Sequence, residues 1–431
     1  MNVSAIILIL VLFAILMGFY SQNKFDYFPI ALIIAVIAIF SMVTFYEVER
    51  TEILGFINFR TLVFIFAMQI IIYFATSDKV LEYFAIKLIH ITKGNNRLLF
   101  YLICIFTGIF VAFIEDLTLS LILIPLIYRT CRILKIPAGT YMMGMTITIN
   151  IGAILTPVSS LKNLIIGQEF EWGFIEYFSN MGILFLITLT LTVLFLDIFI
   201  LRKEEKPTER NKKLLLELGD PSLVIVNKKH FLLTAIILLA TFILMIIGFE
   251  PAIVTVISAS ILLIFHFKKT KFSDIQSAIP LKLIIVFAVL FILSNSLAYF
   301  GFSSFIFTAL AKATNNNIYL SILLILVISS ALSAFLAGTP VTIILLPIFS
   351  EIILISPVPT PIIIAFIGGV NMAGNFLPQG SACDMLTLSL AKKYRVKNLD
   401  YKRLLKTGAL FSTLHFFIIL LYAMVYALIL S

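Results

Sequence analysis

The sequence carries little charge for its length. Charged residues make up 12% of the 431 residues and hydrophobic residues 61%, whereas a soluble domain has about 25% charged residues. This composition excludes a water-soluble protein and predicts a polytopic membrane protein whose first partner is the lipid bilayer. The net charge of +9 does not indicate nucleic-acid binding, because the basic residues fall in short loops between apolar stretches, as cytoplasmic loops do.

Cysteine is scarce as well. The three thiols, Cys104, Cys131 and Cys383, have neither disulfide nor metal-ligand spacing, so we expect them to be small buried hydrophobic residues. We expect no cofactor and no metal apart from a coupling ion. The first 20 residues lack the basic segment and the small-residue cleavage site of a secretory signal, and we expect them to form the first transmembrane helix.

Two apolar stretches are too long for one crossing, which needs about 20 residues. They are 99–134 and 318–355, interrupted in the middle by "FIEDLTLS" and "LAGTPVTI". Each is either two helices with a very short turn or a re-entrant hairpin. About ten further spans are expected: 3–20, 28–46, 62–77, 139–167, 180–201, 231–248, 251–267, 282–300, 360–390 and 406–430.

Loop charges set the expected orientation. Basic residues flank 99–134 on both sides, Lys93 and Arg97 before it and Lys135 after it. Because positive charge marks the cytoplasmic side, this stretch should enter and leave there. The basic linker 202–230 then lies inside, 318–355 opens to the outside, and both termini lie outside. We therefore expect an all-α, multi-pass protein of the plasma membrane.

An internal repeat indicates the architecture. "AFIEDLTLSLILIPLI" resembles "AFLAGTPVTIILLPIF" at an offset of 222 residues, and "NIGAILTPVSSLKNL" resembles "NMAGNFLPQGSACDM" at an offset of 221. The repeat predicts an N-terminal unit, 1–201, and a C-terminal unit, 231–431, each with five spans and one hairpin. An odd number of crossings inverts the second copy, which is the plan of many secondary transporters.

Helix-breaking residues interrupt two of the expected spans, at 150–163 and 371–384. Gly152 opens the first, together with a proline, and Gly374 and Gly380 open the second. Irregular backbone at membrane depth is tolerated only where protein or a water-filled cavity covers it, so both breaks should face the interior. Their half-helix ends present amides and carbonyls with partial charges, which suit an anion and a cation respectively.

Four ionisable residues are expected at the same depth: Glu115, Asp116, Lys162 and Asp384. Each costs at least about 2.5 kcal/mol at the bilayer centre, so each needs a partner or a task. Lys162 neutralises one acid, and the remaining excess of negative charge favours coupling to H⁺ or Na⁺. Nearby hydroxyls and amides complete the candidate site: Thr118, Asn150, Thr156, Ser159, Ser160, Asn163, Thr339, Thr342, Asn371, Asn375 and Ser381.

These motifs resemble the paired signature of the ion-transporter superfamily of arsenite permeases and NhaD-type antiporters, which also includes citrate and dicarboxylate carriers. The resemblance rests on "FIEDLTLSLILIPL", "NIGAILTPVSSLKNLIIG" and "GNFLPQGSACDMLTLSLAKKY", and runs from about residue 50 to the C-terminus. It implies two hairpins and two broken helices around a central site that works by alternating access. It also allows a homodimer and, for an arsenite pump, a cytoplasmic ATPase partner.

The chain departs from that signature where the family has Asp-Pro-Pro, because Ser160, Leu161 and Lys162 stand there. Either the Lys162 ammonium replaces a bound sodium ion, or it contacts an oxyanion directly. The leading interpretation is a secondary active transporter of a small anion or oxyanion, arsenite-permease-like and driven by a proton or sodium gradient. The alternative is a cation–proton antiporter that uses Glu115, Asp116 and Asp384.

Two other classes are disfavoured. An intramembrane enzyme would need a motif such as His-Glu-x-x-His or a Gly-x-Gly-Asp context around its acids, and the sequence has neither. A passive channel would have no use for matched broken helices around a central site. We therefore expect a transporter and not an enzyme.

Overall fold

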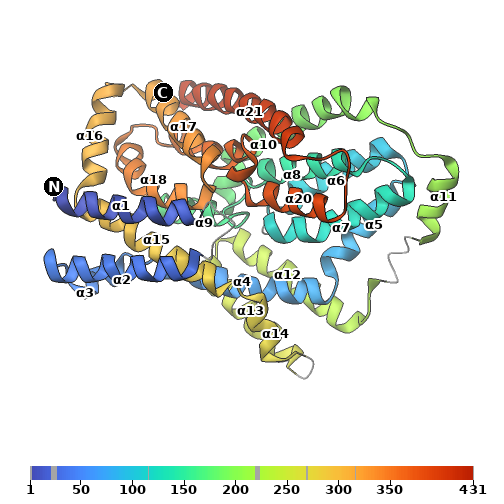
Figure 1. The fold of residues 1–431 in the computed structure, drawn as a ribbon, viewed down its shortest axis with the longest axis horizontal. Helices are drawn as coiled ribbons and strands as arrows, with labels where there is room; N and C mark the ends of the chain where they lie inside the picture. The colour runs from blue at the N-terminus through green and yellow to red at the C-terminus, as the bar shows by residue number, and fades with distance from the viewer. Residues whose placement is uncertain are drawn as a thin grey trace.

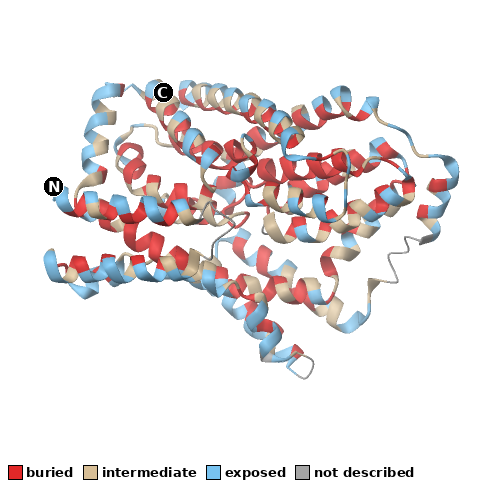
Figure 2. Ribbon diagram, in the orientation of Figure 1, coloured by how far each residue is buried: buried red, intermediate tan, exposed pale blue. Residues whose placement is uncertain are grey.

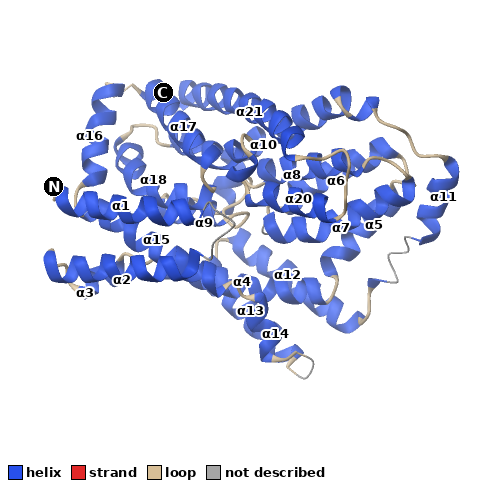
Figure 3. Ribbon diagram, in the orientation of Figure 1, coloured by secondary structure: helices blue, strands red, loops and turns tan. Residues whose placement is uncertain are grey.

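The computed structural model describes residues 2–20, 27–114, 116–218, 224–267, 270–315 and 317–430, and within these ranges it contains helices and no strand (Figure 3). In this described part, nine helices are long and apolar enough to cross a membrane. They are α2 (Tyr27–Phe45), α4 (Phe59–Ser77), α7 (Asp116–Leu134), α10 (Phe174–Phe199), α12 (Lys228–Ile247), α15 (Leu281–Tyr299), α17 (Ile318–Phe335), α18 (Gly338–Ile355) and α21 (Tyr401–Leu430). The expectation of an all-α polytopic membrane protein is confirmed.

The order of the helices repeats along the chain. Four pairs of helices begin at a constant offset of 222 residues. They are α4 with α15, α6 (Asn96–Phe110) with α17, α7 with α18, and α8 (Ala138–Gly152) with α19 (Thr360–Met372). The same order relates α1 (Val3–Tyr20) and α3 (Arg50–Gly55) to α12 and α14 (Phe272–Ala278). The motif offset seen in the sequence therefore extends to the succession of helices.

The two copies exchange their first helices. Helix α2 packs against α15, whereas α13 (Pro251–His266) packs against α4. Each pair thus joins a helix from the start of one copy to the first long helix of the other copy's core. Figure 1 shows the N- and C-termini at one end of the molecule and the linker helix α11 (Glu209–Leu218) at the opposite end.

Five short helices of the described part were not expected from the sequence: α3, α5 (Val80–Ile91), α11, α14 and α16 (Phe302–Thr314). Helices α5 and α16 follow α4 and α15 in the two copies, and they are too short to be recognised as crossings. The linker 202–230, expected as a solvated loop, contains α11. This helix packs on α7, and Asn211 Nδ2 donates a hydrogen bond to Leu134 O at 3.1 Å.

Burial increases towards the broken helices. All fifteen residues of α8 are buried, as are most residues of α19, whereas the outer helices present one apolar face outwards (Figure 2). A helix that is apolar all round belongs in the interior of a bundle. The fold therefore places the two interrupted helices at its centre and surrounds them with helices whose exposed side chains are mainly apolar, as lipid contact requires.

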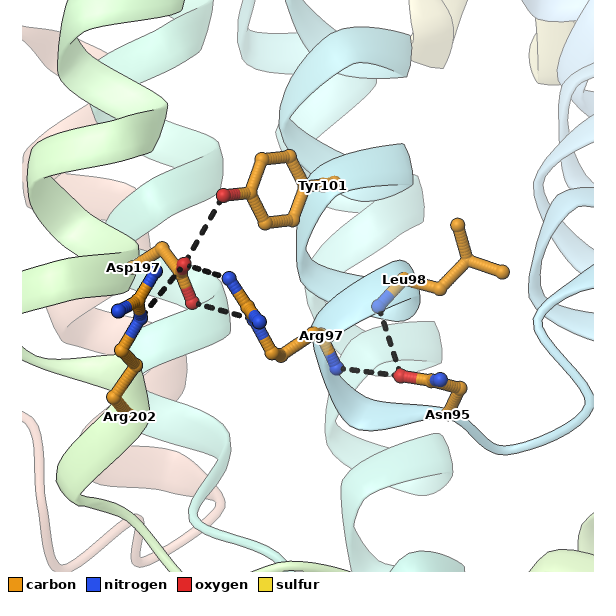
Figure 4. A network of polar contacts seen from close by, with 6 residues as sticks. All are labelled: Asn95, Arg97, Leu98, Tyr101, Asp197 and Arg202. Carbon is orange, nitrogen blue, oxygen red and sulfur yellow. Dashed lines mark hydrogen bonds and ion pairs between the residues drawn. The ribbon is translucent and has the colours of Figure 1, made fainter.

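A buried carboxylate holds the start of α6 against the end of α10 (Figure 4). The Asp197 side chain is 0% exposed. It accepts hydrogen bonds from Arg97 Nε at 3.1 Å and Nη2 at 2.5 Å, from Tyr101 Oη at 3.1 Å, and from Arg202 Nε at 3.3 Å. Two arginines and a tyrosine hydroxyl donate hydrogen bonds to this one carboxylate, so the network fixes the start of α6 to the end of α10.

We expect Asp197→Asn to lower the free energy of unfolding by about 1–3 kcal/mol, because an amide cannot accept the bidentate pair and leaves polar groups unsatisfied. The arginines are half exposed, which keeps the loss below that of a fully buried pair. Thermal unfolding of the detergent-solubilised protein measures the effect. Glu209→Gln is the control, since its surface pair with Lys212 is worth about 1 kcal/mol or less. Equal stability losses in the two variants would contradict the prediction.

Candidate functional site

Both long apolar stretches form helix pairs. Residues 99–134 contain most of α6 and all of α7, and residues 318–355 form α17 and α18. The turn of the first pair lies between Phe110 and Asp116, and that of the second between Phe335 and Gly338. Their entry from opposite sides of the membrane stays a prediction.

Both expected breaks are present as well. Helix α8 ends at Gly152, and α9 (Leu161–Glu169) begins nine residues later. Helix α19 ends at Met372 and is followed by two 3₁₀ turns, Ala373–Asn375 and Pro378–Gly380, before α20 (Ala382–Lys393) begins. Each break therefore separates two half-helices, as the glycines and prolines predict.

One cavity brings the two turns and the two breaks together. It has a volume of about 140 Å³ and is lined by residues from α4, α7, α9, α15, α18 and both breaks. Eight of the residues predicted from the sequence line it: Asp116, Asn150, Ser160, Lys162, Thr339, Gly374, Gly380 and Ser381. Segments that are far apart in the sequence thus converge on one small chamber, whose wall combines these polar residues with apolar ones such as Phe64 and Phe287.

Four helices begin at the wall of this cavity. The first residues of α7, α9, α18 and α20, which are Asp116, Leu161, Gly338 and Ala382, all line it. The first amides of a helix have no partner within the helix, and its N-terminus carries about half a positive charge. Four such ends place partial positive charge around one chamber, which suits an anion. At α7 the Asp116 carboxylate accepts a hydrogen bond from Leu117 N at 2.8 Å and offsets part of this charge.

Lys162 adds a full positive charge to the same wall. Within the described residues its ammonium forms no ion pair, and it lies beside the first turn of α18. A Cβ added at Gly338 would be 3.0 Å from Lys162 Nζ and 2.7 Å from Val370 O. A side chain at residue 338 would therefore displace the lysine, which explains why glycine occupies this position.

Asparagines join the two breaks to each other. Asn150 Nδ2 donates to Asn375 Oδ1 at 2.7 Å and to Ser381 Oγ at 3.2 Å, and Asn371 Nδ2 donates to Asn163 Oδ1 at 2.7 Å. All five residues are buried. These contacts hold the two half-helix pairs in a fixed relative position, which pre-organises the chamber between them.

Some polar atoms around the breaks have no partner among the described residues. They are Ser160 Oγ, Asn375 Nδ2 and Asn371 Oδ1. A buried polar atom without a hydrogen bond costs about 1–3 kcal/mol. Ser160 lines the cavity, so a solute or water in the chamber would supply its missing partner.

The remaining predicted residues that the structure describes do not line the cavity, and several of them make internal contacts instead. Thr156 Oγ1 donates to Ala112 O, and Ser159 Oγ donates to Thr156 O at 2.7 Å. Thr342 Oγ1 donates to Gly338 O within α18 at 2.9 Å. Thr118 is partly buried on α7, and Glu115 lies outside the described residues. The structure therefore gives most of these side chains a supporting position behind the wall.

Asp384 is also set back from the cavity. Its carboxylate is 1% exposed and accepts a hydrogen bond from Thr146 Oγ1 at 2.6 Å. Thr146 belongs to α8, so this contact joins α20 of one copy to α8 of the other. Of the described acids, only Asp116 faces the chamber.

Helices α4 and α15 contribute wall residues that the sequence did not point to. From α4 these include Phe64, Met68 and Gln69, and from α15 they include Phe287. Gln69 is the one carboxamide in "FRTLVFIFAMQIIIYFATS", and an amide in an apolar span is a signal for such a position. The apolar wall residues carry no signal that distinguishes them from lipid-facing residues.

Comparisons with known proteins identify the family of the chain. Residues 8–369 match the citrate transporter family. A 46 kDa membrane protein of Mycobacterium leprae is 23% identical over 78% of this chain and 79% of its own length. An uncharacterized transporter of Mycobacterium bovis is 20% identical over 83% of this chain and 84% of its own length.

The fold is also similar to that of a solved transporter. The crystal structure of the Alcanivorax borkumensis YdaH transporter, described as having an unusual topology, superposes with a TM-score of 0.59 at 12% identity, over 98% of this chain and 97% of that one. The resemblance to the ion-transporter superfamily is confirmed. The chain is a multi-pass membrane transporter and belongs to the citrate transporter family.

Proposed function

We propose that this protein is a secondary active transporter of a small anion, a carboxylate or an oxyanion of the arsenite-permease type. The observation that carries the proposal is the convergence of four helix N-termini and the Lys162 ammonium on one cavity. A solute with negative charge gains from each of these groups, while a cation is repelled by most of them. The family's description as citrate transporters is consistent with a carboxylate.

The same chamber offers a group for coupling. Asp116 begins α7 at the cavity wall, and its protonation, or a sodium ion beside it, would reduce the charge that has to move with the substrate. Because two copies of one helix succession surround the chamber, a relative movement of the hairpins and their partners would open it to either side in turn. We propose H⁺ or Na⁺ as the coupling ion.

Cation–proton antiport is the second candidate, and Asp116 at the cavity wall is the observation in its favour. An antiporter needs carboxylates that exchange a metal cation for protons. Asp384, one of the acids considered for that role, lies behind the wall with a hydrogen bond to Thr146. The excess of positive groups around Asp116 favours the anion over the cation as the transported species.

Transport by purified protein in proteoliposomes tests the two candidates directly. We expect saturable accumulation of at least one anion from a panel of radiolabelled citrate, succinate, sulfate and arsenite when a proton or sodium gradient is imposed. Accumulation should stop when the gradient is collapsed by an ionophore. Sodium–proton exchange in vesicles that accumulate none of these anions would instead establish antiport and overturn the proposal.

A further inference from the structure

A second group of ionisable side chains lies outside the transport cavity, at the ends of three helices. Asp78 follows the last residue of α4, His230 lies in the first turn of α12, and His266 is the last residue of α13. One ligand atom from each of the three lies within 4.8 Å of the others. The first residue comes from the N-terminal copy and the two histidines come from the C-terminal copy.

The hydrogen bonds of His266 restrict its chemistry. Nδ1 lies 2.9 Å from Leu262 O, and Nε2 lies 2.9 Å from Asp78 Oδ2. A carbonyl oxygen only accepts, so Nδ1 carries a proton. In a neutral ring Nε2 is then a bare lone pair that faces a carboxylate. A metal ion bound by both atoms would satisfy this lone pair and the carboxylate together.

The neighbouring histidine favours the metal ion. The ring centroids of His230 and His266 are 4.4 Å apart, so both imidazoles can reach one ion. A metal ion binds both rings in their neutral form. Neighbouring groups hold two of the three side chains in place. Thr234 Oγ1 donates a hydrogen bond to Asp78 Oδ2 at 2.7 Å, and the Leu262 carbonyl accepts one from His266 Nδ1. Such outer contacts typically support metal ligands.

We infer that Asp78, His230 and His266 form a binding site for a divalent transition metal, with Zn²⁺ as the ion that best fits two imidazoles and one carboxylate. With bonds of about 2.0–2.2 Å, the ligand atoms would need only small side-chain adjustments from their present separation. Water would complete a tetrahedral set. The ion would join α4 of one copy to α12 and α13 of the other. It would lie at the C-terminal end of α4, beyond the α4 residues that line the cavity.

Metal binding to the purified full-length protein tests this inference. After treatment with a chelator and reloading with Zn²⁺, we expect about one tightly held zinc per chain by elemental analysis, as for other three-ligand sites. Co²⁺ should give the visible absorption of a tetrahedral complex. His230→Gln and Asp78→Asn should each weaken binding by at least about 10–100-fold, the loss that even an outer-shell contact produces.

His90→Gln is the matched control, because His90 lies at the far end of α5 from Asp78, and it should bind zinc like the wild type. His230→Gln is the more informative variant, since His230 is less buried than His266 and its replacement disturbs packing less. Chromatographic monodispersity of each variant reports folding separately from binding. A well-folded wild type that binds no more zinc than His230→Gln would overturn the inference.

Discussion

Lys162→Met is expected to lower anion uptake by at least about tenfold at low substrate concentration while leaving membrane insertion and purification unchanged. Methionine retains the length and apolar stem of lysine but removes the charge that lies beside the first turn of α18. Within the described residues the ammonium makes no ion pair. The described carboxylate whose charge it opposes is Asp116, and that acid keeps its hydrogen bond from Leu117 N. Initial rates of anion uptake into proteoliposomes, at matched protein content, measure the effect.

The loss of substrate affinity in Lys162→Met should be large. A hydrogen bond to a charged group contributes about 1.5–3 kcal/mol, and about 1.4 kcal/mol corresponds to a factor of ten in affinity. Loss of Lys162 alone should therefore weaken substrate binding by at least about tenfold, with the four helix ends supplying what remains. Lys162→Arg keeps the charge but not the shape, and should retain partial uptake.

Lys393→Met is the matched control, because Lys393 lies exposed at the end of α20. It removes the same charge from the same protein and should leave uptake unaffected. Uptake by Lys162→Met at the wild-type rate, with unchanged half-saturation, would remove Lys162 from the substrate site.

The charged wall residues of the chamber could be predicted because hydrocarbon makes charge costly. Asp116 and Lys162 stood out in apolar stretches, and the helix-breaking residues beside them required an interior position. Asn150 and Ser381 followed from the same reasoning. These predictions depend only on local composition and on the bilayer as solvent, so no knowledge of the tertiary structure was needed.

The supporting residues could not be distinguished from ligands in that way. The hydroxyls of Thr156 and Ser159 are polar groups in the same interrupted segment, but their partners are the carbonyls of Ala112 and Thr156. Which oxygen a hydroxyl meets depends on how the broken backbone folds back. Sequence identifies the polar groups at such a break, and the path of the backbone decides which of them face the cavity.

Contacts between the two copies could not be predicted from the sequence for a different reason. More than 150 residues separate Asp78 from His230 and His266, and no prediction was made for any of the three. Their meeting depends on α13 packing against α4, an exchange of helices that no local pattern encodes. The same exchange brings α4 and its Gln69 to the chamber wall.

Gly152 has two roles at the break after α8, because it ends the helix and also allows it to pack closely against α6. It was predicted to open α8 near the site, and α8 does end there. The structure adds a packing role, because a Cβ at this position would overlap Gly108 O and lie 2.5 Å from Val111 Cγ1. Helix α8 thus approaches α6 closely, just before the turn that leads to Asp116.

Gly152→Ala should therefore reduce the free energy of unfolding by about 3 kcal/mol or more, at the upper end of the range for overpacked cores. The obstructing atom is a backbone oxygen, which cannot rotate away as a side chain can, so α8 and α6 must separate. Thermal unfolding followed by size-exclusion chromatography measures the loss. Gly182→Ala is the control, since Gly182 lies within α10 with no atom near the added methyl group, and alanine should stabilise a helix there by about 0.5–1 kcal/mol. If both variants were as stable as the wild type, the fold would not require the close approach of α8 to α6. The position of Asp116 at the cavity wall would then depend on other contacts of α7.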